Sequence, residues 1–164
     1  MKITIRKALL ADAYDYTDCS ISCFQTTYKG IASDEFLNNL PNEREQRVEK
    51  FRETLTDPDI ETYCVIFENE IIGFFVIHEK DSCIWAIYLL EEYRSMGNGK
   101  EMLDFAVGNL KCIGHKNITL WVLEKNIRAR RFYEKNGFSF DGTKRENAKY
   151  GNLLVQLRYA LNIK

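Results

Sequence analysis

Two glycines one residue apart, Gly97 and Gly99, stand where this sequence could bind an anion. They follow CIWAIYLL (Cys83–Leu90), an apolar run typical of a buried strand, and precede a stretch with helical spacing. The unpaired N–H groups of a helix's first turn point outward, and the helix dipole adds partial positive charge. Glycine also lets the backbone approach a phosphate without a Cβ in the way. The segment predicts an anion site, with a ligand-free tight turn as the alternative.

Two common phosphate-binding motifs do not fit these glycines. A dinucleotide fingerprint of the form Gly-x-Gly-x-x-Gly needs a third glycine at the position of Met102. A P-loop needs a wider glycine spacing and Ser or Thr after its lysine, but Glu101 follows Lys100. The sequence therefore supports neither a Rossmann dinucleotide site nor a nucleoside triphosphate site.

A third pattern fits better, and it comes in two parts. YRSMGNGK (Tyr93–Lys100) has the form Arg/Gln-x-x-Gly-x-Gly, and here the chain resembles the pyrophosphate loop of the GNAT N-acetyltransferase superfamily. WVLEKNIRARRFYEKNGF (Trp121–Phe138) resembles the family's other signature, in which Asn126 is followed seven residues on by Tyr133 and then by a Gly-Phe pair. The order of predicted elements extends the resemblance over nearly the whole chain.

The resemblance implies that acetyl-CoA is the acyl donor and lies across the end of the CIWAIYLL run. Backbone N–H groups from Ser95 to Lys100 are expected to hold its pyrophosphate, and its pantetheine arm to pair like an added strand with Ile87–Leu89. That run and NITLWVL (Asn117–Leu123) are expected to diverge where the cofactor enters. The full set of implied cofactor-binding residues is Ile87, Tyr88, Leu89, Arg94, Ser95, Met96, Gly97, Asn98, Gly99, Lys100, Asn126 and Tyr133.

The implied reaction is acyl transfer, in which an amine attacks the thioester and a thiolate leaves. By the resemblance, Tyr133 stands near the sulfur, and the backbone N–H at Leu89 is the natural donor to the developing oxyanion. A thiol has a reference pKa of about 8.5 and a tyrosine about 10, so a tyrosine hydroxyl can serve the departing thiolate as an acid. Judged alone, Tyr133 would be a core tyrosine, but its register with Asn126 and Gly137 favours the catalytic interpretation.

No general base is assigned from the sequence. Some relatives, notably those that acetylate the N-terminus of a ribosomal protein, carry Glu five residues before the Asn, and this chain has Trp121 there. Glu124, Glu92 and the hydroxyl of Tyr88 are the candidates, and a water relay is the alternative.

Other residues have two interpretations each. Arg128, Arg131 and Lys135 share one helical face, which either meets the adenosine phosphate of the cofactor or is solvated. In the family, the loop between the first helices borders the acceptor site, so Phe24 and Tyr28 are expected to line it, with core packing as the alternative. Neither histidine has partners at metal or triad spacing, so no metal site is expected.

These residues need a scaffold, and the periodicity predicts one GNAT-like domain over residues 1–164. Its class is α/β (an α+β mixed sheet), with a central, mostly antiparallel sheet, one parallel βαβ crossover and about four flanking helices. The helices are expected over Ala11–Thr27, Asp34–Leu40 and Glu43–Leu55, after the glycines, and before Gly137. The strands are expected at Lys2–Ala8, Thr62–Phe67, Ile71–Ile77, Cys83–Leu90, Asn117–Leu123 and around Leu153–Tyr159.

The composition narrows the class of protein. Hydrophobic residues make up 45% and charged residues 29% of the 164, which is ordinary for a soluble globular protein. The net charge of −1 gives no sign of nucleic acid or membrane as a partner, and no apolar run reaches the length of a membrane span. Five cysteines, an odd number without a CxxC pair, favour a reducing, cytoplasmic location over a disulfide framework or zinc site.

The sequence thus predicts an N-acetyltransferase that passes the acetyl group of acetyl-CoA to a primary amine by direct attack in a ternary complex. The alternative is a catalytically silent acyl-CoA-binding sensor or partner-binding module of the same fold, which Trp121 keeps open. The acceptor, either a small-molecule amine or a peptide or protein N-terminus, cannot be read from the sequence. A homodimer is an option because dimers are common in the family.

Overall fold

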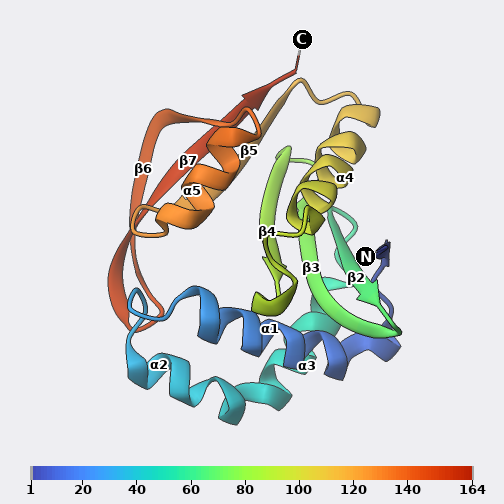
Figure 1. Cartoon of the computed structure of the whole chain (residues 1–164), viewed down its shortest axis with the longest axis vertical. Helices are drawn as coiled ribbons and strands as arrows, with labels where there is room; N and C mark the ends of the chain where they lie inside the picture. Colours follow the sequence, from blue (N-terminus) through green and yellow to red (C-terminus); the bar gives the residue numbers. More distant parts are fainter. Residues whose placement is uncertain (1, 164) are drawn as a thin grey trace.

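The computed structural model describes residues 2–163 and folds them into a seven-stranded sheet with helices on both faces (Figure 1). The strands are β1 (Thr4–Lys7), β2 (Ile60–Phe67), β3 (Glu70–His78), β4 (Cys83–Leu89), β5 (Asn117–Leu123), β6 (Ser139–Lys149) and β7 (Asn152–Asn162). The α-helices are α1 (Ala13–Thr27), α2 (Asp34–Asn39), α3 (Arg44–Thr54), α4 (Asn98–Cys112) and α5 (Ile127–Lys135). Most predicted boundaries lie within a few residues of these, as expected for fraying ends.

The sheet has the order β1-β2-β3-β4-β5-β7-β6. Neighbouring strands run antiparallel except β4 and β5, which run parallel and are connected through α4. The predicted mixed sheet with one parallel crossover is therefore confirmed.

Helices cover both faces because the central strands are apolar on both sides. Residues 72–77 of β3 are all buried, which confirms the prediction of a central strand. The stripe of Leu103, Ala106 and Leu110 packs α4 onto one face, the face that also carries α5. On the other face, Cys19 and Cys23 pack α1 onto β3, and α2 and α3 lie beside α1 across the lower end of the sheet in Figure 1.

The strand β6 was not predicted from the sequence. Its residues are mostly polar, and a register shift against β7 between Phe140 and Lys144 breaks the alternation that would reveal a strand. Gly142, with a φ of 93°, lies in this irregular segment. β6 is recognisable through its pairing with β7, which the local sequence does not encode.

Residues 2–163 contain neither a membrane-spanning helix nor a cluster of metal ligands. No helix in this part of the chain is long and apolar enough to cross a membrane. The same residues contain no group of three or more side chains that could hold a metal ion.

Candidate functional site

A cleft opens where β4 and β5 part. The two strands pair through Cys83 with Thr119 and through Ile84 with Leu120, and they separate beyond these pairs, which confirms the predicted divergence. A cavity of about 800 Å³ fills the gap, a volume within the range of small-molecule sites. Its walls come from β4, β5, the loop before α4, and α5.

The edge of β4 that faces this cavity carries free backbone groups. The N–H of Leu90 donates to the carbonyl of Ile72 on β3 at 2.9 Å. Because backbone groups alternate in direction along a strand, those of Leu89 and Ile87 turn the other way, into the gap that β5 has left. Nε of Arg94 donates to the carbonyl of Leu89 at 2.9 Å, so the N–H of Leu89 is the group left to serve a ligand.

The loop before α4 presents its amides in the same cavity. Within residues 2–163, the N–H groups of residues 95–99 donate to no acceptor, since the first bonds of α4 run from Lys100 and Glu101 back to the carbonyl of Gly97. Gly97 has a φ of 89°, which only glycine adopts readily. Gly99 has no such requirement, and a Cβ there would meet only the ring of Phe132, at an ordinary 3.6 Å. The protein itself does not need a glycine at position 99, whereas a ligand close to the backbone would.

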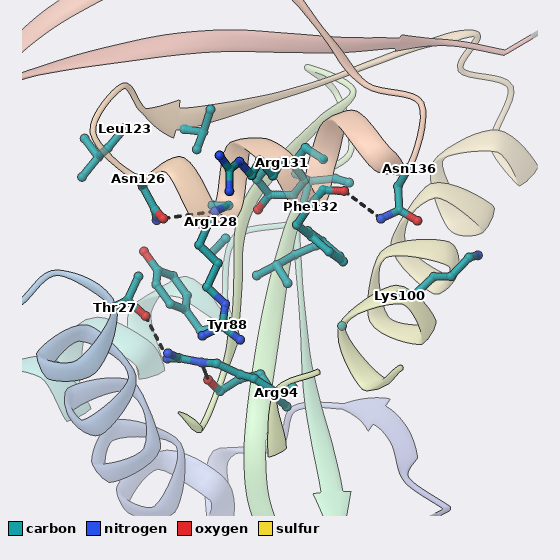
Figure 2. A pocket seen from close by; sticks show the side chains of 18 of the residues that line it. Thr27, Tyr88, Arg94, Lys100, Leu123, Asn126, Arg128, Arg131, Phe132 and Asn136 are labelled. Carbon is teal, nitrogen blue, oxygen red and sulfur yellow. Dashed lines mark hydrogen bonds between the residues drawn. The ribbon is translucent and has the colours of Figure 1, made fainter. Parts of the chain in front are cut away.

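Positive charge surrounds this loop (Figure 2). Nη2 of Arg128 lies 3.4 Å from the hydroxyl of Ser95, so α5 reaches across to the loop. Among the described residues, Glu91 is the single carboxylate in the lining. The basic residues of the lining are Arg94, Lys100, Arg128, Arg131 and Lys135. The cleft is therefore suited to a ligand with several negative charges.

Arg94 ties this loop to two other elements. Besides the carbonyl of Leu89, its guanidinium donates to the hydroxyls of Thr26 at 2.9 Å and Thr27 at 3.0 Å, at the end of α1. Burial, followed by the nearby charge of Arg128, lowers the pKa of Arg94. The side chain thus holds the end of β4, the loop and α1 together.

Tyr133 and Asn126 both line the cleft, from α5 and its N-cap. Oδ1 of Asn126 accepts from the N–H of Ala129 at 3.1 Å, which starts the helix and leaves the amide nitrogen available to a ligand. Burial raises the pKa of Tyr133 to about 12, so its hydroxyl stays protonated throughout the physiological range.

The structure brings together most, but not all, of the sequence-predicted residues. Ile87, Tyr88, Leu89, Arg94, Ser95, Gly97, Gly99, Lys100, Asn126 and Tyr133 all line the cleft. Two loop residues lie outside it. Met96 is 60% exposed and points elsewhere, and Asn98 is buried, with Nδ2 donating to the carbonyl of Tyr93 at 2.8 Å. Asn98 therefore braces the loop from within.

The far end of the cleft is aromatic. Tyr28 lines it, and its hydroxyl is hydrogen-bonded to that of Tyr88. Burial raises the pKa of both tyrosines above the ordinary value, so both stay neutral. Phe24 lies behind this pair, stacked on Tyr88 with ring centroids 5.0 Å apart, and is outside the lining. Tyr150, at the turn between β6 and β7, stacks on Tyr28 at 5.0 Å.

None of the three candidate general bases is well placed or well suited to act as one. Glu124 pairs with Lys144 at 3.2 Å and lies outside the lining, as does Glu92. Tyr88 lines the cleft, but its raised pKa makes it a poor base.

Sequence reasoning missed several lining residues. Trp121 and Gln156 come from β5 and β7, and their meeting depends on strand pairing that no local pattern reveals. Arg128 and Arg131 had an open interpretation, and the structure puts both in the lining. Phe132 carried a usable signal, since it sits one residue before Tyr133 on the same short helix.

Comparisons with known proteins agree with this geometry. Residues 26–138 match the model of the acetyltransferase (GNAT) family. The chain is similar to an uncharacterized N-acetyltransferase of Mycobacterium tuberculosis, with 30% identity over 114 residues, covering 66% of this chain and 73% of the relative. It is also similar to a spermidine N(1)-acetyltransferase of Thermoplasma acidophilum, with 28% identity over 149 residues, covering 87% and 92%.

Solved structures share the fold. The PaiA N-acetyltransferase from Thermoplasma acidophilum in complex with coenzyme A has a TM-score of 0.78 and 23% identity, with 99% of each chain covered. A GCN5-related N-acetyltransferase from Rhodopseudomonas palustris has a TM-score of 0.80 and 14% identity, with 99% of this chain and 97% of the other covered.

Proposed function

We propose that this chain, which belongs to the acetyltransferase (GNAT) family and is an N-acetyltransferase, binds acetyl-CoA in the cleft between β4 and β5 and passes the acetyl group directly to a bound primary amine. One observation carries the proposal. A single cavity joins an amide-rich cationic loop, an unpaired strand edge and a protonated tyrosine. Each of the three suits a different part of the cofactor.

The loop suits the diphosphate. The free amides of residues 95–99 lie at the start of α4, where the helix dipole favours negative charge. Gly99 leaves space beside Phe132 for a phosphate to reach these amides. Arg128 adds positive charge beside the loop, whereas the ammonium of Lys100 is already paired with Asp104, and charge-assisted hydrogen bonds are the strong ones.

The strand edge suits the pantetheine arm. Its amides can pair with the backbone of Ile87, in the manner of an added strand, while the N–H of Leu89 stays available to the acyl group. The amide nitrogen of Asn126 faces the same cleft and provides a further donor. Together these contacts direct the thioester to the aromatic end of the cleft.

When bound, acetyl-CoA supplies an activated acyl group with a thiol as leaving group. The N–H of Leu89 donates to the carbonyl oxygen as negative charge develops there. Tyr133 donates a hydrogen bond to the departing sulfur. With a pKa of about 12 against about 8.5 for a thiol in water, full proton transfer from Tyr133 is uphill, so stabilisation by hydrogen bonding is its main contribution.

The amine must lose a proton before it attacks, and residues 2–163 place no carboxylate in the lining at that end. Among the described residues, the lining there consists of Tyr28, Tyr88, Leu123, Trp121 and Gln156. We therefore assign deprotonation to water at the open end of the cleft, so that the reaction requires the neutral fraction of the amine.

The test measures binding and turnover separately. Calorimetry with coenzyme A reports binding, and release of free thiol from acetyl-CoA with a panel of primary amines reports turnover. We expect micromolar binding or tighter, and amine-dependent thiol release. Binding without release from any amine would favour the silent acyl-CoA-binding module, and absence of binding would refute the proposal.

A further inference from the structure

The acceptor end of the cleft has a positively charged side chain, Arg145, beside it. Trp121 and Leu123 project from the same face of β5, and the neighbouring strands add Gln156 and Arg158 of β7, the cross-strand partners of Leu123 and Trp121. Arg145 of β6 pairs with Gln156 and joins the same face. Helices α1 and α2 cover only one end of this face, at Leu123.

Arg145 is exposed and lies outside the lining of the cleft, but its side chain is held against two residues that line it. Its guanidinium carbon lies 4.0 Å above the ring of Trp121, a cation–π distance. Its Nε donates to Oε1 of Gln156 at 2.7 Å, and Nδ2 of Asn147 donates to the same oxygen at 3.0 Å. Because Trp121 and Gln156 both line the cleft, the guanidinium is fixed beside the acceptor space.

The charge of Arg145 is not compensated. Its neighbour Arg158 is paired with Asp141 at 2.6 Å, whereas Arg145 forms no ion pair with any residue that the structure describes. Its two terminal NH₂ groups are also without a hydrogen bond inside residues 2–163. A planar guanidinium with free terminal donors binds a carboxylate in a bidentate manner.

Residues 2–163 place no negatively charged side chain in the lining of the acceptor end. No carboxylate from the described residues joins Tyr28, Trp85, Tyr88, Trp121 and Gln156 in the lining, and Glu91 lies beside Arg94 in the turn that leads to the glycine loop. A polyamine keeps at least one further positive charge after its reacting nitrogen is neutral. Here that charge would meet Arg145, whereas Asp141, the acid that reaches this face, is already paired with Arg158.

We propose that the acceptor is an amine that also carries a carboxylate, an amino acid or a compound of that kind, and that Arg145 binds the carboxylate. This rests on the proposed function, since it names the substrate class of the same site. Trp121 then has a role that a glutamate at its position could not have: it supports the guanidinium without neutralising it. The aromatic end formed by Tyr28 and Tyr88 accepts an apolar side chain.

The test compares matched acceptors and matched variants. Thiol release from acetyl-CoA is measured with a panel of amino acids, with the amine that lacks the carboxylate of each, for example phenylalanine and phenethylamine, and with spermidine. The variants are Arg145→Gln and, as control, Lys144→Gln, because Lys144 precedes Arg145 on β6 but pairs with Glu124 outside the cleft. In parallel, calorimetry on the protein saturated with coenzyme A measures binding of N-acetylphenylalanine, N-acetylleucine and N-acetylphenethylamine.

We expect kcat/KM for the best amino acid to exceed that of its matched amine, and Arg145→Gln to reduce this ratio about ten- to hundredfold while Lys144→Gln leaves it unchanged. Equal or faster acetylation of spermidine or of the matched amines, or an unchanged ratio in Arg145→Gln, would overturn the inference and leave the proposed function intact. If no amine releases thiol, the proposed function fails. In that case the calorimetry tests the carboxylate site by itself. Tighter binding of the N-acetyl amino acids than of N-acetylphenethylamine, lost in Arg145→Gln, supports a carboxylate site at Arg145. Equal binding of these compounds, or binding unchanged in Arg145→Gln, refutes that site.

Discussion

Replacing Gly99 by alanine should separate the stability of the fold from its function. Gly99 is the second residue of α4, its φ lies outside the left-handed region, and a Cβ there meets only Phe132 at 3.6 Å. Alanine in a helix is more stable than glycine by about 0.5–1 kcal/mol. For a chain of this length, the melting temperature should rise by roughly 1–4 °C.

The same methyl group should weaken cofactor binding. It projects into the space beside Phe132 through which a phosphate must pass to reach the amides of residues 95–99. Loss of one hydrogen bond to a charged group costs about 1.5–3 kcal/mol. Because about 1.4 kcal/mol is a factor of ten, the Kd for coenzyme A should rise about ten- to 150-fold.

Gly108 provides the matched control. It lies in the same helix, a Cβ there meets nothing within 4 Å, and it is outside the lining of the cleft. Gly108→Ala should therefore raise the melting temperature without changing the Kd. Calorimetric titration and thermal unfolding of both variants check the two predictions. An unchanged Kd in Gly99→Ala would refute the assignment of this loop to the diphosphate.

The remaining predictions concern three side chains. Tyr133→Phe should lower kcat about ten- to 150-fold with little change in KM, measured as thiol release, because one hydrogen bond to the developing thiolate is lost, and equal turnover would exclude the role at the sulfur. In the parent protein, the raised pKa of Tyr133 contributes free energy of unfolding that is complete below pH about 10 and is lost as pH rises through about 12. Phenylalanine does not ionise, so Tyr133→Phe should lose less stability over this alkaline range than the parent protein, as measured by denaturant unfolding. Arg94→Met removes one hydrogen bond to the end of β4 and two to the end of α1, and it should destabilise the fold by about 2 kcal/mol and lower kcat/KM, with unchanged kinetics counting against the role of Arg94 in positioning Leu89. Asp12 accepts from Arg6 at 2.7 and 2.8 Å, and these bonds lower its pKa, so Asp12→Asn should cost about 2 kcal/mol at pH 7, and this cost, followed by denaturant unfolding, should shrink as pH falls below about 4 and through the lowered pKa of Asp12; a cost independent of pH would contradict the role of the carboxylate charge.

The sequence predicted the part of the site that is local in the chain. The loop before α4 is one continuous segment, so the spacing of Gly97 and Gly99 after an apolar strand carries its signal directly. Tyr133 and Asn126 are likewise set by one short helix and its cap. The parallel crossover followed from the order of strand, helix and strand.

The acceptor end could not be predicted in the same way. Arg145 meets Trp121 because β7 lies between their two strands, and this pairing is a property of the sheet. The polar sequence of β6 conceals the strand that brings Arg145 there. Glycine spacing also failed to predict that Asn98 would be buried beneath the loop, since its amide is engaged by the carbonyl of Tyr93.

The short parallel contact has a mechanical consequence. The sheet consists of a four-strand part, β1 to β4, and a three-strand part, β5 to β7. The strands that meet, β4 and β5, pair at two residue pairs and are connected by α4, and the core packs across the boundary (Figure 1). The boundary between β4 and β5 should therefore open locally when no ligand is bound, and within the sheet amide hydrogen exchange should be fastest in the second half of β4. A cofactor bound between β4 and β5 would contact both strands and should slow amide exchange in both.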